Sequence, residues 1–258
     1  MSRVFTVGFF TFRELIRSKM LFVWLISVVV LCGLAFLLSI LSYGDILNIF
    51  MDLGLVGMEV SGLMVLILSL AVTYTTEMDQ KAIYLHLSKP LTRGEYLLGR
   101  IFGFYLVVLL VVLGMGLVVV GLVIFAGGGQ VPTFFYDCVL FLLLEMFLLT
   151  VLGLTFQMIA TSMVGVVIYT FFTIFLGHLI GEIQWLLGKQ LAPMINFALQ
   201  VIYYCLPNMD VFNLKDRIYD PTLVLGAAQW QEVLLYTFAY SFLVFLIGWI
   251  NLEKREFV

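Results

Sequence analysis

The chain has 258 residues, of which 63% are hydrophobic and only 11% are charged, and its formal net charge is -3. With a mean hydropathy of +1.15, it is far from a soluble globular domain, in which roughly a quarter of the residues are charged. No basic stripe occurs outside the short loops, which excludes nucleic-acid binding. We therefore expect an all-α integral membrane protein.

Residues 1–20 have the pattern of an amphipathic helix. Their apolar face carries four residues at helical spacing: Phe5, Phe9, Phe12 and Ile16. Charged residues gather on the opposite face. We expect a surface helix in the inner membrane interface; the alternative is a positively charged leader that only fixes the topology.

Six stretches are long and apolar enough to cross a bilayer, since a hydrocarbon core about 30 Å thick needs roughly 20 such residues per helix. They lie at about 21–41, 53–76, 101–126, 138–162, 164–187 and 233–252. No small-residue cleavage site follows the first, which we therefore interpret as a retained helix and not as a signal peptide. Residues 21–258 are predicted to form one transmembrane domain.

The placement of Lys and Arg predicts the orientation. With six spans, ten of the thirteen basic residues lie on the side of both termini, which is therefore expected to be cytoplasmic. A seventh crossing at 193–206 would give the same ratio, so charge leaves the number open. That stretch is short for a span, and apolar stretches of this length are more often re-entrant or interfacial. We favour a re-entrant element within an extracytoplasmic segment, 188–232.

A charged insert, 77–100, separates the second and third spans. Its first part can continue the second span as a helix, and Pro90 should end that helix. Thr92 and Glu95 then match a capping box at the start of the next helix. The pattern predicts a helical hairpin in the cytoplasm; an ordinary solvated loop is the alternative.

Two features inside the apolar spans are candidate polar sites. Glu145 lies within the fourth span, where a buried carboxylate is costly; it either lines a polar path or makes a structural hydrogen bond. His178 and Glu182 are four residues apart near the outer end of the fifth span and can meet on one helix face. Two ligands are too few for a zinc site, so we predict a hydrogen-bonded pair and no metal site.

The fifth span also carries small residues at four-residue intervals: Thr173, Gly177 and Gly181. Small residues at this spacing let helices approach closely. They form a candidate dimer interface; packing within one subunit would need them equally.

Residues 82–100, AIYLHLSKPLTRGEYLLGR, resemble the first intracellular loop of ABC-2 type transporter permeases. Three other stretches agree with this resemblance in the order of the spans. They are FRE with RSK at 12–14 and 17–19, LPN with FNL at 206–208 and 212–214, and KREF at 254–257.

The resemblance implies a permease that pairs with a second copy or a related permease in a bacterial inner membrane. It implies an interfacial elbow helix bearing Phe12, Arg13, Glu14 and Arg17. The loop after the second span would seat in a groove on a separate ATPase subunit, present in two copies, to which ATP and Mg would bind. The ATPase-coupling residues implied here are Glu77, Lys81, Tyr84, His86, Ser88, Lys89, Pro90 and Arg93.

The chain itself lacks an ATP-hydrolysing motif. Its Gly188-Lys189 pair is followed by Gln190, where a phosphate-binding loop requires Ser or Thr. We expect no enzyme activity and no cofactor in this chain, and interpret it as the permease subunit of an ATP-driven exporter whose cargo the sequence does not identify. One alternative transmits force to a periplasmic partner at 208–222. Another is a proton-coupled carrier using Glu145 and His178, although the internal repeats expected of such carriers are not evident.

Overall fold

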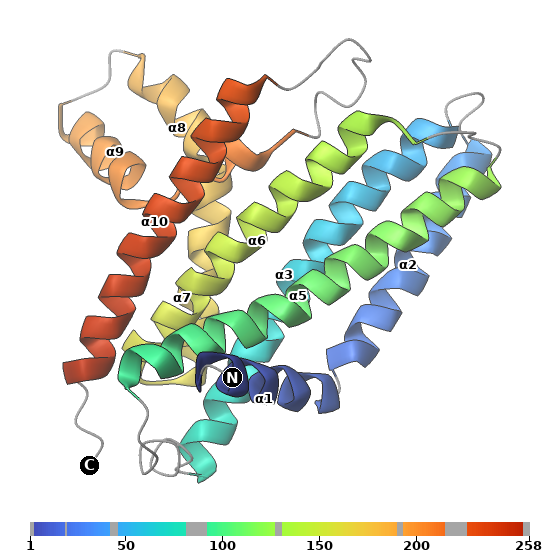
Figure 1. Ribbon diagram of the computed structural model, residues 1–258. Coiled ribbons are helices and arrows are strands. Elements are labelled where there is room, and N and C mark those ends of the chain that lie inside the picture. Colours follow the sequence, from blue (N-terminus) through green and yellow to red (C-terminus); the bar gives the residue numbers. More distant parts are fainter. Residues whose placement is uncertain are drawn as a thin grey trace.

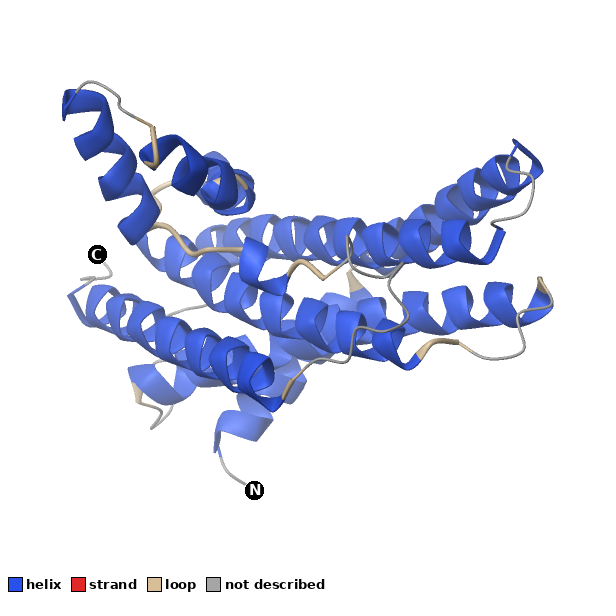
Figure 2. Cartoon of the chain, turned by 90° about the horizontal axis from the view of Figure 1, so that it is seen from above, coloured by secondary structure: helices blue, strands red, loops and turns tan. Residues whose placement is uncertain are grey.

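The computed structural model describes residues 3–18, 20–41, 46–80, 92–126, 131–189, 193–214 and 226–254. These residues form helices joined by short connections, and none of them lies in a strand (Figure 2). The elements are α1 (Arg3–Arg17), α2 (Met20–Leu41), α3 (Ile46–Gln80), α5 (Arg93–Phe125), α6 (Thr133–Ile159), α7 (Met163–His178), α8 (Ile180–Leu187), α9 (Pro193–Cys205), the 3-10 turn η1 (Asp210–Phe212) and α10 (Ala227–Lys254).

The long helices run alternately up and down in one bundle, and α1 and the last turn of α10 both lie at its lower end (Figure 1). Four helices, α3, α5, α6 and α10, are each long and apolar enough to cross a membrane. The bent pairs α1–α2 and α7–α8 raise the number of candidate spans to six if each pair is one span. The prediction of an all-helical, multi-pass membrane protein is therefore confirmed.

Several helices extend beyond the apolar stretches that the sequence marks. The 35 residues of α3 correspond to about 50 Å of helix, more than the thickness of a hydrocarbon core. Its last turns, up to Gln80, continue the second span into the charged insert as predicted.

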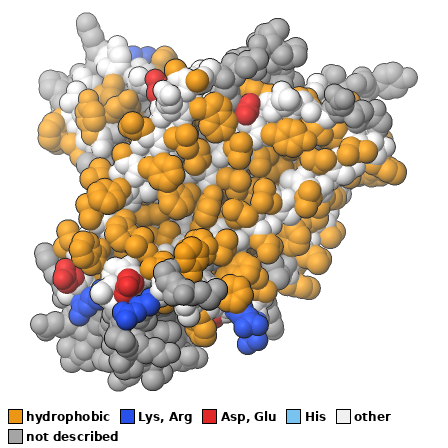
Figure 3. Space-filling view, in the orientation of Figure 1, with side chains coloured by type: hydrophobic (Ala, Val, Ile, Leu, Met, Phe, Trp, Pro, Cys, Tyr) orange, Lys and Arg blue, Asp and Glu red, His pale blue; other side chains and the backbone are white. Residues whose placement is uncertain are grey.

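The outer surface of the bundle is a broad hydrophobic belt. Figure 3 shows apolar side chains across the middle of one face and charged side chains near its upper and lower margins. Exposed members of this surface include Leu117, Phe171, Phe175, Phe238 and Phe242. The interior is centred on α6, which is apolar on all sides and is the most buried of the candidate spans. A helix of this kind belongs in the core of a bundle.

The amphipathic helix at the amino terminus forms as predicted, but the sequence did not reveal how it is held. Helix α1 crosses α5, its main neighbour, and buries a face made of Gly8, Thr11 and Leu15. On α5, Gly99 and Gly103 leave room for this crossing: a Cβ at Gly103 would come within 2.6 Å of the Gly8 carbonyl oxygen. Phe5, Phe9 and Phe10 remain more than half exposed and can contact lipid, whereas Phe12 packs against the hydrophobic core.

The fifth span is not the continuous helix that the sequence predicts for 164–187. It breaks at Leu179, and α7 and α8 are inclined by 51°. The next helix, α9, begins at Pro193 and ends before Pro207, close to the predicted limits, and packs against α8. Its re-entry into the bilayer stays a prediction.

Candidate functional site

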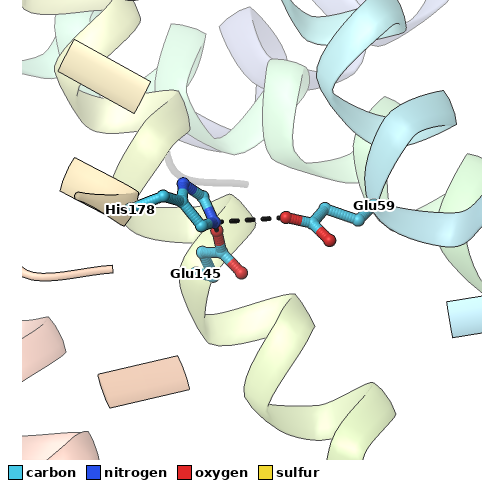
Figure 4. Close-up of side chains that lie close together, drawn as sticks. All are labelled: Glu59, Glu145 and His178. Carbon is cyan, nitrogen blue, oxygen red and sulfur yellow. Dashed lines mark ion pairs between the residues drawn. The ribbon is translucent and has the colours of Figure 1, made fainter. Parts of the chain in front are cut away.

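Three ionisable side chains from three different helices meet inside the bundle (Figure 4). Glu59 comes from α3, Glu145 from α6 and His178 from the last residue of α7. The Nε2 atom of His178 lies 3.2 Å from Oε1 of Glu59 and 3.3 Å from Oε1 of Glu145. The Glu145 side chain is only 6% exposed and that of Glu59 12%, whereas His178 is 32% exposed. We call these three residues the Glu-Glu-His cluster.

The imidazole ring of His178 is held from both sides. Its Nδ1 lies 3.0 Å from the carbonyl oxygen of Ile174, one helical turn earlier. A carbonyl oxygen can only accept a hydrogen bond, so Nδ1 carries a hydrogen and donates it. The other ring nitrogen, Nε2, faces the two carboxylates.

The cluster lines a small cavity with a volume of about 10 Å³. A space of this size holds about one water molecule. The remaining walls come from Leu55 on α3, Cys138 and Leu142 on α6, Phe212 at the end of η1, and Asn213 and Leu214 after it. The end of η1 and the two residues that follow thus form one wall of the cavity.

The segment 207–210 also satisfies the backbone groups released where α7 ends and α8 begins. The amide of Met209 donates to the carbonyl of Gly177 over 3.2 Å. The carboxylate of Asp210 accepts from the amide of Gly181 over 2.6 Å, in the first turn of α8. Unpaired backbone groups are costly at membrane depth, and irregular backbone persists there only where protein or water covers it. Hydrogen bonds from segment 207–210 therefore stabilise the break between α7 and α8.

Two further hydrogen bonds hold segment 207–210 in position. The amide of Asp210 donates to the side-chain oxygen of Asn208 over 3.0 Å. The amide of Asn208 in turn donates to the hydroxyl of Tyr236 on α10 over 2.6 Å. The segment thus links the helix break to the last span.

This arrangement bears on two predictions for the fifth span. Gly177 and Gly181 approach Met209 and Asp210 of the same chain, so packing within one subunit accounts for both. Thr173 is buried and its hydroxyl donates to the carbonyl of Tyr169. These contacts favour the alternative of packing within one subunit, and a dimer interface at these positions stays a prediction.

The predicted pair of His178 and Glu182 is wrong. Both ring nitrogens of His178 contact other groups, whereas Glu182 lies beyond the break at Leu179 and is exposed. The prediction assumed an unbroken helix, in which residues four apart share a face.

The cluster has an electrostatic requirement. Two ionised carboxylates and one imidazole together carry a net negative charge, even when the imidazole is protonated. Burial of net charge is unfavourable, so a cation bound at the cluster would stabilise it. The two carboxylates and the imidazole nitrogen are also suitable ligands for a metal ion.

Most of the predicted ATPase-coupling residues lie outside the described residues: Lys81, Tyr84, His86, Ser88, Lys89 and Pro90. Glu77 belongs to the last turn of α3, but its side chain is outside the description. The capping box is confirmed, since the amide of Glu95 donates to the Thr92 hydroxyl and the amide of Thr92 to the Glu95 carboxylate.

Arg93 makes contacts within the chain. Its guanidinium donates to the carbonyl oxygens of Leu252 and Glu253, at 2.5 and 2.6 Å, in the last turn of α10. A cation is favourable at this end of a helix, where the last carbonyls have no helical partner. Arg93 therefore ties the beginning of α5 to the end of α10.

Arg100 does not belong to a solvated insert, contrary to the sequence interpretation. It is only 2% exposed, within α5. Its guanidinium donates to the Tyr96 hydroxyl over 2.9 Å and stacks near the rings of Tyr96 and Phe104. The charged insert consequently ends before this residue.

The predicted elbow residues Phe12, Arg13, Glu14 and Arg17 all lie on α1. Arg13 is placed over the ring of Phe9, 5.6 Å from its centre.

Searches against protein-family models and curated proteins found no match for the chain.

Proposed function

We propose that the chain is the membrane subunit of an ATP-driven ABC-2 type exporter, working as a dimer with two copies of a separate ATPase. The proposal starts from the resemblance of residues 82–100 to the coupling loop of such permeases. ATP and Mg would be bound by the partner ATPase, and this chain would convert its movement into displacement of the helices. The membrane would be the cytoplasmic membrane of a bacterium, with both termini on the cytoplasmic side.

The observation that carries the proposal is the arrangement at the lower end of the bundle. The ends of α3 and α5 that flank residues 81–91 lie at the same end of the bundle as α1 and the last turn of α10 (Figure 1). A partner that grips the intervening segment can therefore push on two spans at once. Helix α1 would move with α5, because the two pack through Gly8, Gly99 and Gly103.

Arg93 extends this connection to a third span. It follows the N-cap Thr92 directly and holds the final carbonyls of α10. Displacement of the first turn of α5 would therefore also move α10. Through the hydrogen bond between Tyr236 and Asn208, it would move the segment at the α7–α8 break as well. This path supports mechanical coupling without chemistry in the chain itself.

The experiment is a mild-detergent purification of the untagged partner with the tagged chain, followed by reconstitution and measurement of ATPase stimulation. We expect an ATPase to co-purify and Lys89→Glu to abolish its stimulation without preventing membrane insertion. Lys189→Glu is the matched control. Lys189 follows α8, on the predicted extracytoplasmic side, so this variant should leave ATPase stimulation unchanged. Absence of an ATPase, or normal stimulation by the Lys89 variant, would contradict the proposal. A co-purified periplasmic protein would favour force transmission over export.

A second candidate function is a proton-coupled carrier, and the Glu-Glu-His cluster favours it. Buried ionisable residues that exchange protons are typical of such carriers. The chain reconstituted alone in liposomes would then carry a proton flux that Glu145→Gln reduces. A flux that requires the ATPase would instead support the exporter.

A further inference from the structure

We propose that Glu59, Glu145 and His178 bind one divalent transition-metal ion, Zn²⁺ or an ion with similar coordination. The inference is independent of the proposed function, because it depends only on the geometry of the Glu-Glu-His cluster. The two Oε atoms and Nε2 all lie within 4.8 Å of one another.

The distances in the cluster suit a metal better than a direct ion pair. In a tetrahedral zinc site with bonds of about 2.0–2.1 Å, neighbouring ligand atoms are about 3.3–3.4 Å apart. The Nε2 atom of His178 lies 3.2 and 3.3 Å from the two carboxylate oxygens. Charge-assisted hydrogen bonds are shorter, about 2.7–2.9 Å, and one N–H shared between two carboxylates forms only a longer, bifurcated hydrogen bond.

The orientation of the imidazole agrees with this assignment. Metal-binding histidines usually donate the hydrogen of their other ring nitrogen to a carboxylate or a backbone carbonyl, which fixes the ring. In this chain Nδ1 of His178 donates to the carbonyl of Ile174. When the ring is neutral, the lone pair of Nε2 is then directed toward Glu59 and Glu145, where a cation would be bound by all three groups.

Charge provides the third argument. A dipositive ion compensates both carboxylates while the imidazole stays neutral. Glu145 is 6% exposed, and an isolated carboxylate in such a place is strongly unfavourable. A bound cation removes this cost without protonating the ligands.

The surroundings fit a small ion with an open coordination position. The cavity has room for about one water molecule, which would be the fourth ligand. Cys138 and Asn213 also line the cavity and carry further atoms that could bind a metal. The exposed third of the His178 side chain provides access. Mg²⁺ and Ca²⁺ prefer six or more oxygen ligands, so we expect neither to bind tightly.

The test uses the full-length, untagged chain in detergent, stripped with a chelator and titrated with Zn²⁺ and with Co²⁺ as a coloured probe. We expect one ion per chain, a tetrahedral Co²⁺ absorption spectrum, and a higher melting temperature with Zn²⁺. Glu145→Gln and His178→Asn should weaken Zn²⁺ binding by roughly 100-fold or more, since even outer-shell changes cost 10–100-fold. Glu182→Gln, which removes the same charge from the exposed side of α8, should bind Zn²⁺ as the unaltered chain does.

Three results would overturn the proposal: no stoichiometric Zn²⁺, equal affinity in the cluster variants and the control, or equal competition by Mg²⁺. If the cluster variants fail to fold, X-ray absorption at the zinc edge of the unaltered chain decides. One imidazole with oxygen ligands supports the site. A shell without imidazole, or one dominated by sulfur, would place the ion elsewhere and refute it.

Discussion

The carboxylate of Asp210 accepts a hydrogen bond from the backbone amide of Gly181 across the break between α7 and α8. It occupies the place of an N-cap for α8, although it comes from a segment 29 residues further along the chain. The carbonyl of Gly177, on the other side of the break, is bonded by the amide of Met209. One short segment thus satisfies both broken ends, and His178 is held between them.

We predict that Asp210→Ala lowers the free energy of unfolding by about 1 kcal/mol, since loss of an N-cap costs about 0.5–2 kcal/mol. Asp210→Asn keeps a side-chain acceptor and should lose less. Thermal unfolding in detergent would measure both. Glu232→Gln, an exposed position on α10, controls for the lost charge. Equal effects of the Ala and Asn variants would contradict the capping role.

The crossing of α1 over α5 makes a second prediction. A methyl group at Gly103 would meet the carbonyl oxygen of Gly8 and the Cβ of Thr11 at 2.6 and 2.7 Å. Gly103→Ala should therefore destabilise the protein by about 1–3 kcal/mol, the usual cost of overpacking. Gly121→Ala is the matched control on the same helix, because nothing lies within 4 Å of its added methyl.

The melting temperatures of the two glycine variants provide the measurement. The Gly121 variant should be neutral or slightly more stable, since alanine favours helix by about 1 kcal/mol over glycine. A Gly103 variant as stable as the Gly121 variant would show that α1 does not pack as described.

The coarse fold was predictable because the membrane imposes it. Long apolar stretches can only be helices there, and the predicted limits of α9 and the capping box at Thr92 follow from proline and side-chain chemistry. The α1–α5 crossing was missed because small residues indicate that another segment packs closely against the helix, but they do not indicate which segment it is. Gly99 and Gly103 have the same four-residue spacing as Gly177 and Gly181, yet one pair receives a helix and the other an irregular segment.

The site was predictable only in part. Glu145 and His178 stand out as ionisable residues in apolar spans, and the short connection from Ile159 to Met163 places them at similar heights on antiparallel helices. Their proximity could have been inferred by counting residues from this connection, because Glu145 and His178 lie at nearly equal distances from it along the two helices. The break at Leu179 could not, because the groups that stabilise it lie on segment 207–210, far along the chain. Assuming an unbroken helix led to the wrong partner, Glu182.

Arg93 yields a third prediction. Arg93→Ala removes both hydrogen bonds to the final carbonyls of α10 and should loosen its last turn, at a cost of about 1 kcal/mol. Hydrogen–deuterium exchange of residues 250–254 should become faster. Arg13→Ala, which removes an arginine from α1, is the control and should leave this exchange unchanged. Unchanged exchange in the Arg93 variant would refute the tie between α5 and α10.

The last prediction concerns the energetic coupling between Glu145 and His178, measured in chelator so that no metal contributes. His178→Ala leaves two carboxylates without the imidazole between them, and loss of one partner of a buried pair is strongly destabilising, by about 3–5 kcal/mol in well-buried cases. Because His178 is one-third exposed, we expect a smaller effect here. Adding Glu145→Gln removes one of the opposed charges and should restore part of the lost stability.

A double-mutant cycle makes this quantitative. Side chains in contact show coupling of about 0.5–3 kcal/mol, and independent sites add within about 0.3–0.5 kcal/mol. We expect the first range for His178 with Glu145, and additivity for His178 with Glu182, whose side chain lies beyond the helix break and is exposed. If the coupling energy is larger for His178 with Glu182 than for His178 with Glu145, the pair predicted from the sequence is correct and the Glu-Glu-His cluster does not form. The cycle therefore decides which carboxylate the imidazole faces, because charge and isosteric shape are changed in the same way at both positions.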